Sequence, residues 1–169
     1  MNRVVLLRGF LDSRKIKRAI EEILSVSQGD MLTLVIDSDG GNLSPAIKFI
    51  EFLEKKRGHG IMVNSRIYNA KSMASIIALS ANFVEMDRGA TLELHQGSLH
   101  LESSDFDLSG QISNDAMAQF VKYRQLLQNI LDKYRIQQNP KMMAELSGSN
   151  WLKLSAKECK ERYIIDEIF

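Results

Sequence analysis

The sequence predicts an α/β protein built around a largely parallel sheet. Along residues 4–95, short apolar segments alternate with longer segments that have one apolar face or are apolar throughout. A glycine pair, Gly40 and Gly41, separates one apolar segment from the next. This alternation is typical of strand–helix–strand units with right-handed crossovers, so we expect helices on both faces of the sheet.

The first predicted unit is a strand over residues 4–7 followed by a helix that Asp12 or Ser13 can cap. Apolar residues recur along this helix at spacings of three and four, which gives it one face that can pack on the sheet. The residues of this face are Ile16, Ala19, Ile20, Ile23 and Leu24.

The second predicted unit begins with a strand over residues 31–36 and turns at the glycine pair. Ser44 then supplies an N-cap, and Pro45 suits the first position of a helix. A third strand over residues 61–67 leads to residues 72–81, whose side chains are mostly small or apolar on every side. A helix without a polar face must be buried.

Residues 83–86 and 91–95 are two further short predicted strands. After a polar stretch, residues 115–135 predict a long helix that is a candidate oligomer contact. Its apolar residues at helical spacing are Met117, Phe120, Val121, Leu127, Leu131 and Tyr134.

The last part of the chain predicts two short helices and a strand. Pro140 can open a helix over residues 142–146, and Ser155 can cap the next one. Residues 164–169 form the final predicted strand.

Composition and charge limit the classes of partner. There are 22 Lys and Arg against 21 Asp and Glu, a net charge of +1, so no overall field attracts nucleic acid. The single cysteine, Cys159, excludes an internal disulfide and has no His or Cys at metal-ligand spacing, so we expect it to pack in the core, with no metal and no cofactor. With neither a secretory leader nor an apolar run of about 18 residues, we expect a cytoplasmic protein without a membrane span.

Ser72 and His95 are the residues best suited to chemistry. Ser72 opens a buried helix, where the peptide dipoles favour negative charge, although serine is also a common N-cap with no other role. His95 ends an apolar strand, and an imidazole with a pKa near 6.5 suits a general base. Gly40 and Gly41 can present backbone N–H groups to an oxyanion, or they can serve the turn alone. Lys71 is next to Ser72 in sequence, but adjacent side chains seldom face each other, so we do not expect a Ser-Lys dyad.

Three short segments resemble, in order and spacing, the signature blocks of the ClpP peptidase family. They are IDSDGG at residues 36–41, AKSMA at residues 70–74 and LHQ at residues 94–96. The beginning and end of the chain resemble the same family, so the resemblance covers nearly the whole sequence. It implies a ClpP/crotonase-like α/β fold of repeated β-β-α units with a protruding handle helix.

The resemblance also implies the roles of individual residues. Ser72 is then the nucleophile and His95 the base of a serine-type endopeptidase that forms an acyl-enzyme. The amide of Gly40 or Gly41 and that of Met73 form the oxyanion hole. The implied substrates are unfolded polypeptides or short peptides.

The implied organisation is one ClpP-like domain over residues 1–169. Its head comprises residues 1–97 and 148–169, and its handle region comprises residues 98–147. Family members assemble into rings through the handle helix, so we expect a homo-oligomer. The sequence begins at its first strand, so we expect no axial loops, and contact with an AAA+ unfoldase is left open.

Several positions depart from the family pattern. Asp39 and Gly97 each stand where the family has a proline, Tyr68 and Asn69 replace a Gly-Gln pair, and Ala74 replaces a glycine. Residues 147–155, where the family's triad aspartate is expected, contain no carboxylate. Asn150 is the best substitute in the triad, since an amide oxygen can accept the Nδ1 proton of a histidine.

These departures leave three hypotheses. The first is a serine peptidase whose activity is weakened by the missing carboxylate. The second is a catalytically inactive ClpP-like ring subunit or scaffold. The third is a crotonase-type protein that polarises an acyl-thioester carbonyl, for which the Ser72 and His95 pair has no evident role.

Overall fold

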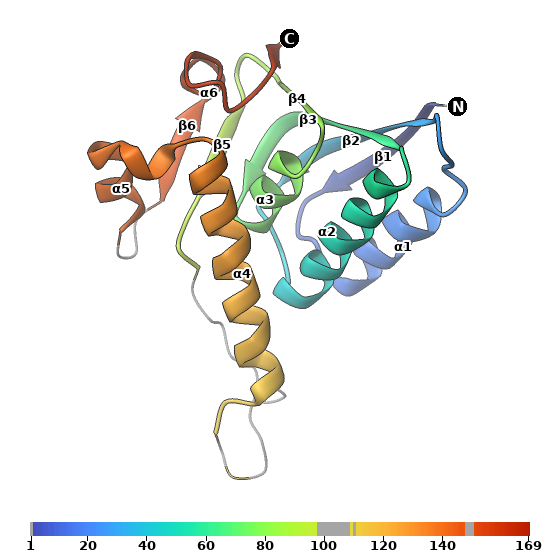
Figure 1. The fold of residues 1–169 in the computed structure, drawn as a ribbon, viewed down its shortest axis with the longest axis horizontal. Coiled ribbons are helices and arrows are strands. Elements are labelled where there is room, and N and C mark those ends of the chain that lie inside the picture. The colour runs from blue at the N-terminus through green and yellow to red at the C-terminus, as the bar shows by residue number, and fades with distance from the viewer. Residues whose placement is uncertain (1, 98–108, 110, 148–150) are drawn as a thin grey trace.

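The computed structural model describes residues 2–97, 109, 111–147 and 151–169. These residues form a mixed α/β fold around one sheet (Figure 1). Five parallel strands follow one another across it: β1 (Asn2–Arg8), β2 (Met31–Ser38), β3 (Met62–Lys71), β4 (Phe83–Met86) and β7 (Glu167–Ile168).

Two further strands extend the sheet beside the end of β3. β5 (Thr91–Leu94) runs parallel to β3 and pairs with its last two residues. β6 (Leu152–Ser155) runs antiparallel to β5. The predicted parallel sheet is therefore confirmed, and it carries one antiparallel strand that the sequence did not predict.

Several α-helices and one 3₁₀ turn accompany the sheet. In chain order they are α1 (Ser13–Ile23), α2 (Leu43–Gly58), α3 (Met73–Leu79), α4 (Asn114–Lys133), the 3₁₀ turn η2 (Ile136–Gln138), α5 (Pro140–Leu146) and α6 (Ala156–Glu161). α4 packs against α2 and α3 and then extends away from the sheet (Figure 1). Each helix that the sequence predicts is present.

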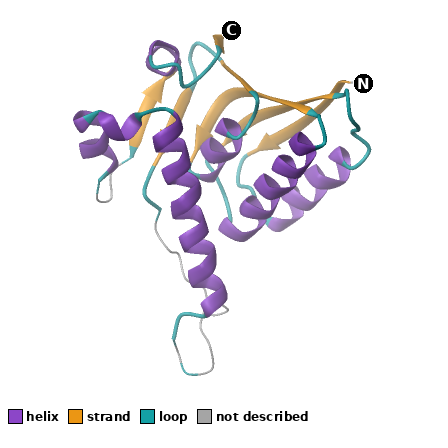
Figure 2. Cartoon of the chain, viewed as in Figure 1, coloured by secondary structure: helices purple, strands orange, loops and turns teal. Residues whose placement is uncertain are grey.

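Helices α1, α2 and α3 lie on the same face of the sheet (Figure 2). In β1 the side chains of Val5 and Leu7 are each 1% exposed, whereas those of Val4 and Leu6 are 54% and 58% exposed. Strands whose two faces differ in this way have one covered face. The expectation of helices on both faces is therefore wrong for β1 within the described residues.

A side-chain cap explains where α1 begins. The Asp12 side chain accepts a hydrogen bond from the Lys15 N–H at 2.8 Å, as predicted. α1 ends at Ile23, so Leu24 lies outside it and is exposed instead of buried. α2 begins at Leu43 after Asn42, so the prediction that Ser44 is the N-cap is two residues late.

Strand β3 is longer than predicted and this affects the site. It continues past Ile67 to Lys71, since Ala70 pairs with Ser38 on one side and Leu92 on the other. A register shift in β2 between Ile36 and Asp37 accommodates the extra residue of β3. Ser72 therefore follows the strand directly.

Side-chain caps lie at the starts of α4, α5 and α6, and of these only the cap at Ser155 was predicted. Ser113 caps α4, Asn139 caps α5, and Ser155 forms a capping box with Glu158 at the start of α6. Cys159 is buried in α6, in agreement with a packing role. The final strand is shorter than predicted because it pairs with β4 only at Glu167–Ile168.

Candidate active site

Ser72 lies at the junction between β3 and α3 with a strained backbone. Its φ and ψ are 53° and −125°, a region that residues with a side chain rarely adopt. Its N–H donates to the carbonyl oxygen of Glu93 at 2.9 Å, and its side chain makes no capping hydrogen bond. The sharp turn therefore leaves the hydroxyl free to contact other groups.

The buried start of α3 holds this turn in place. All seven residues of α3 are buried. The Ser75 hydroxyl lies 2.8 Å from both the Ala70 and the Glu93 carbonyl oxygens, so it ties the first turn of α3 to β3 and β5. The helix and the two strands thus fix the position of Ser72.

His95 follows β5 and contacts Ser72. The distance from Ser72 Oγ to His95 Nε2 is 2.6 Å, within hydrogen-bond range. Burial lowers the pKa of His95 from 6.5, so the imidazole is neutral at pH 7. The structure brings together the two residues that the sequence singles out as nucleophile and base.

The other ring nitrogen of His95 contacts the backbone of the turn that follows. The Gly97 N–H donates a hydrogen bond to Nδ1 at 3.1 Å. Tyr123 of α4 is buried beside this turn, and its hydroxyl donates to the His95 carbonyl oxygen at 2.6 Å. Gly97 has a φ of +83°, and a β-carbon there would lie 2.5 Å from the Tyr123 ring, so only glycine fits.

The backbone amides of Gly41 and Met73 lie close to Ser72 and have no acceptor within the described residues. The Gly40 N–H, in contrast, donates to Ser38 Oγ at 3.1 Å. Gly40 packs so closely on the turn at Ser72 that a β-carbon on Gly40 would lie 3.0 Å from the Ser72 β-carbon. Of the two candidate glycines, Gly41 is therefore the one with an available donor.

Gly41 can hold this position only because it lacks a side chain. A β-carbon on Gly41 would lie 2.2 Å from the Leu11 carbonyl oxygen. The backbone of Leu11 pairs with the glycine turn: its N–H donates to the Gly40 carbonyl at 2.8 Å, and its carbonyl accepts from the Asn42 N–H at 3.0 Å. These bonds direct the Gly41 N–H away from Leu11.

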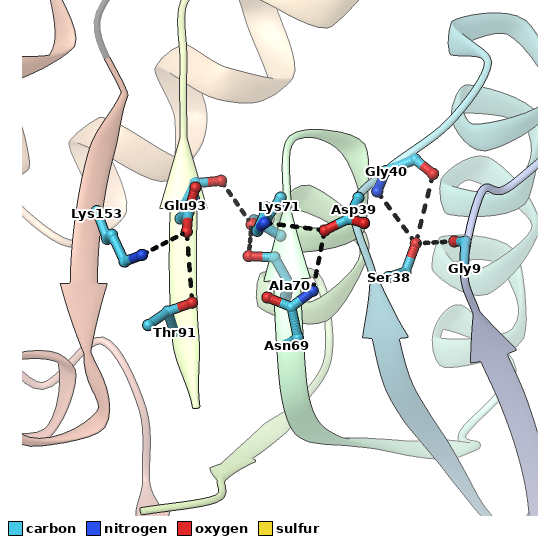
Figure 3. Close-up of polar contacts among 11 residues, drawn as sticks. Gly9, Ser38, Asp39, Gly40, Asn69, Ala70, Lys71, Thr91, Glu93 and Lys153 are labelled. Atoms are coloured by element: carbon cyan, nitrogen blue, oxygen red, sulfur yellow. Dashed lines mark hydrogen bonds and ion pairs between the residues drawn. The ribbon is translucent and has the colours of Figure 1, made fainter. Parts of the chain in front are cut away.

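Charged residues beside the glycines and Ser72 pair with each other (Figure 3). Lys71 Nζ lies 3.0 Å from Asp39 Oδ1, and Asn69 donates to the same oxygen at 3.2 Å. The hydrogen bond from Lys71 lowers the pKa of Asp39, and the same contact raises the pKa of Lys71. A protonated, paired Lys71 is not a base for Ser72, in agreement with the sequence analysis.

Ser72, His95, Gly41 and Met73 all line one cavity of about 980 Å³. Apolar side chains from α1, α2 and α4 form much of its remaining wall, among them Ile16, Ile20, Leu43 and Phe120. A cavity of this size with a few converging polar groups is typical of a ligand site. Within the described part of the chain, no cluster of metal-ligating side chains occurs and no helix could span a membrane.

A sequence model of the Clp protease family matches residues 1–169 of the chain. The chain belongs to the Clp protease family. The resemblance seen in the three sequence blocks is therefore confirmed.

A solved structure shows the same fold as this Clp protease family member. The ClpP protease catalytic domain from Plasmodium falciparum superposes with a TM-score of 0.70 at 15% sequence identity, over 99% of this chain and 84% of that one. No curated protein sequence matches the chain significantly. The predicted ClpP-type α/β fold is confirmed.

Asn150, the candidate third member of the triad in this Clp protease family chain, lies outside the described residues. Its neighbour Trp151 is described, and its indole stacks on the His95 imidazole. Local sequence patterns did not predict Trp151, Tyr123 or the Gly97 N–H as partners of His95. The signals were weak: the only tryptophan follows Asn150, and a glycine lies two residues after the histidine.

Proposed function

We propose that this Clp protease family member is a serine endopeptidase that acts through an acyl-enzyme on Ser72. The observation that carries the proposal is the 2.6 Å contact between Ser72 Oγ and His95 Nε2 at a strained strand-to-helix turn. A serine is a weak nucleophile unless an adjacent base takes its proton, and a neutral imidazole can do so.

The proposed reaction has two steps. His95 takes the hydroxyl proton while Ser72 Oγ bonds to the peptide carbonyl carbon, and the imidazolium then gives this proton to the leaving amine as the C–N bond breaks. In the second step water attacks the acyl ester, and His95 again takes and returns a proton. The carboxylic acid product is released and Ser72 is restored. The Gly41 and Met73 amides stabilise the oxyanion in both steps, and removing one such donor costs about 10²–10³ in kcat.

The organisation of the molecule is part of the proposal. We assign residues 1–97 and 148–169 to a head and residues 98–147 to a handle region of one domain, with α4 as the handle helix. Exposed apolar residues of α4, Met117 and Val121, support a contact between copies in a homo-oligomeric ring. The substrates would be unfolded polypeptides or short peptides in the cytoplasm. The proposal leaves open whether an AAA+ unfoldase binds the ring.

A fluorophosphonate probe tests the serine peptidase directly. The intact protein should gain one probe mass on Ser72, and Ser72→Ala and His95→Ala should each abolish the gain. Ser44→Ala is the matched control, because Ser44 lines the same cavity without contacting the imidazole. Native protein that never reacts with the probe would contradict the proposal.

A second candidate is a catalytically inactive ring subunit. Within the described residues no Asp or Glu contacts the His95 ring, although such a carboxylate normally stabilises the imidazolium. Native mass spectrometry with an active paralogue should then show mixed rings. Cleavage of an unfolded polypeptide by the purified protein would exclude this candidate. Membership of the Clp protease family favours either of these over an acyl-thioester enzyme.

A further inference from the structure

The contact between Gly97 and His95 determines which ring nitrogen of the imidazole carries the proton. A neutral imidazole carries one N–H, and its other nitrogen accepts. Because the Gly97 N–H donates to Nδ1, Nδ1 must be the accepting nitrogen and the ring proton lies on Nε2. We infer that Gly97 is a positioning residue that holds resting His95 in this tautomer, so that Nε2–H donates to Ser72 Oγ.

This inference rests on the proposed function and deepens it. A general base must offer the lone pair of Nε2 to the serine hydroxyl, which requires the ring proton on Nδ1. In the observed geometry an Nδ1–H would face the Gly97 N–H at an Nδ1 to N distance of 3.1 Å, and two donors cannot share a hydrogen bond. In the resting protein His95 therefore donates to Ser72 and does not accept the hydroxyl proton. Ser72 stays a weak nucleophile in this state.

Helix α4 fixes the direction of the Gly97 N–H. Tyr123 donates to the His95 carbonyl, and Arg124 Nη1 lies 3.3 Å from Gln96 Oε1. Helix α4 therefore contacts the two residues that precede Gly97. The Tyr123 ring also fills the space where a side chain of residue 97 would lie. Activation then requires that residues 95–97 shift relative to α4, so that Nδ1 is released and can be protonated.

The family motif that this sequence resembles has a proline in place of Gly97. Proline has no backbone N–H and could not make this contact. The donor to Nδ1 thus exists because residue 97 of this chain has a backbone N–H.

Nitrogen NMR of the intact protein reads the tautomer without any need for catalysis. Protein with ¹⁵N-labelled histidine is recorded at pH 7.5, and His95→Gln identifies the His95 signals among those of three histidines. We expect Nε2 to have the shift of a protonated nitrogen and Nδ1 that of an unprotonated one. A protonated Nδ1 would overturn the inference.

A backbone substitution tests the cause. Semisynthesis can replace the Gly97 amide by an ester, which removes the N–H and keeps the backbone freedom of glycine. The same semisynthetic protein with its native amide is the matched control. Loss of one hydrogen bond should shift the tautomer ratio toward Nδ1–H and raise the rate of fluorophosphonate reaction at Ser72 by about two- to tenfold.

The two proposals fail in different ways. An ester variant with an unchanged tautomer ratio and an unchanged labelling rate would overturn the role of Gly97 and leave the peptidase intact. If neither protein reacts with the probe, the peptidase is contradicted, and the nitrogen shifts still decide the tautomer.

Discussion

The indole of Trp151 stacks on the imidazole of His95, with ring centroids 4.1 Å apart and planes inclined by 20°. Trp151 precedes β6, whose antiparallel pairing with β5 brings this C-terminal segment beside the histidine. The stack covers one face of the ring, which contributes to the burial that lowers the pKa of His95. The residue before β6 therefore helps to bury the imidazole of His95.

Trp151→Ala should raise the pKa of His95 toward the ordinary value of 6.5, because water then reaches the exposed ring face. NMR titration of the His95 ring protons measures this change. Trp151→Phe is the matched control, since a phenyl ring can still cover the imidazole. An unchanged pKa in the alanine variant would show that other groups bury the ring.

The reaction of Ser72 with a fluorophosphonate should depend on pH through His95. Only the neutral imidazole can accept a proton, so the rate should fall in acid with an apparent pKa below 6.5. The same shift affects stability: the unfolded chain binds the proton first, so stability falls as pH decreases below 6.5 toward the folded pKa. Labelling rates between pH 4.5 and 8 test the first part, and an apparent pKa above 6.5 would contradict it.

Gly41→Ala should destabilise the fold and abolish labelling of Ser72. The new methyl group would overlap the Leu11 carbonyl, and overpacking of this kind costs about 1–3 kcal/mol or more. Urea unfolding measures the loss. Gly58→Ala is the control, because a β-carbon on Gly58 meets no atom within 4 Å at the end of α2, and it should be neutral or slightly stabilising.

The Asp39–Lys71 ion pair should contribute little to stability. Most of the Asp39 side chain is exposed, and pairs of this kind contribute about 0–1 kcal/mol. A double-mutant cycle with Asp39→Asn and Lys71→Gln measures the coupling free energy of unfolding. We expect labelling of Ser72 to persist in each variant. Complete loss of labelling in Lys71→Gln would instead indicate that this lysine takes part in the reaction.

Much of the fold follows from local sequence patterns. The apolar runs gave the positions of β1 to β4. The predicted capping residues Asp12 and Ser155 lie at helix starts because short polar side chains satisfy free N–H groups there. Strand β6 was missed, since its pattern is only four residues long and its partner β5 is distant in the chain.

The site was predictable only in part. Ser72 and His95 could be singled out because each residue type has an intrinsic chemistry and each lies at a predicted element end. The choice of Gly41 over Gly40 depends on a hydrogen bond to Ser38. The partners of His95 come from α4, from the residue before β6 and from the next turn. Long-range packing of this kind leaves no local pattern in the sequence.

Peptide mapping of the native protein after fluorophosphonate treatment decides whether Ser72 is a nucleophile that His95 activates. We expect one adduct, located on Ser72, that disappears in His95→Ala and persists in Ser44→Ala. No adduct on Ser72, or an adduct that forms equally well without the imidazole of His95, would contradict the proposed peptidase.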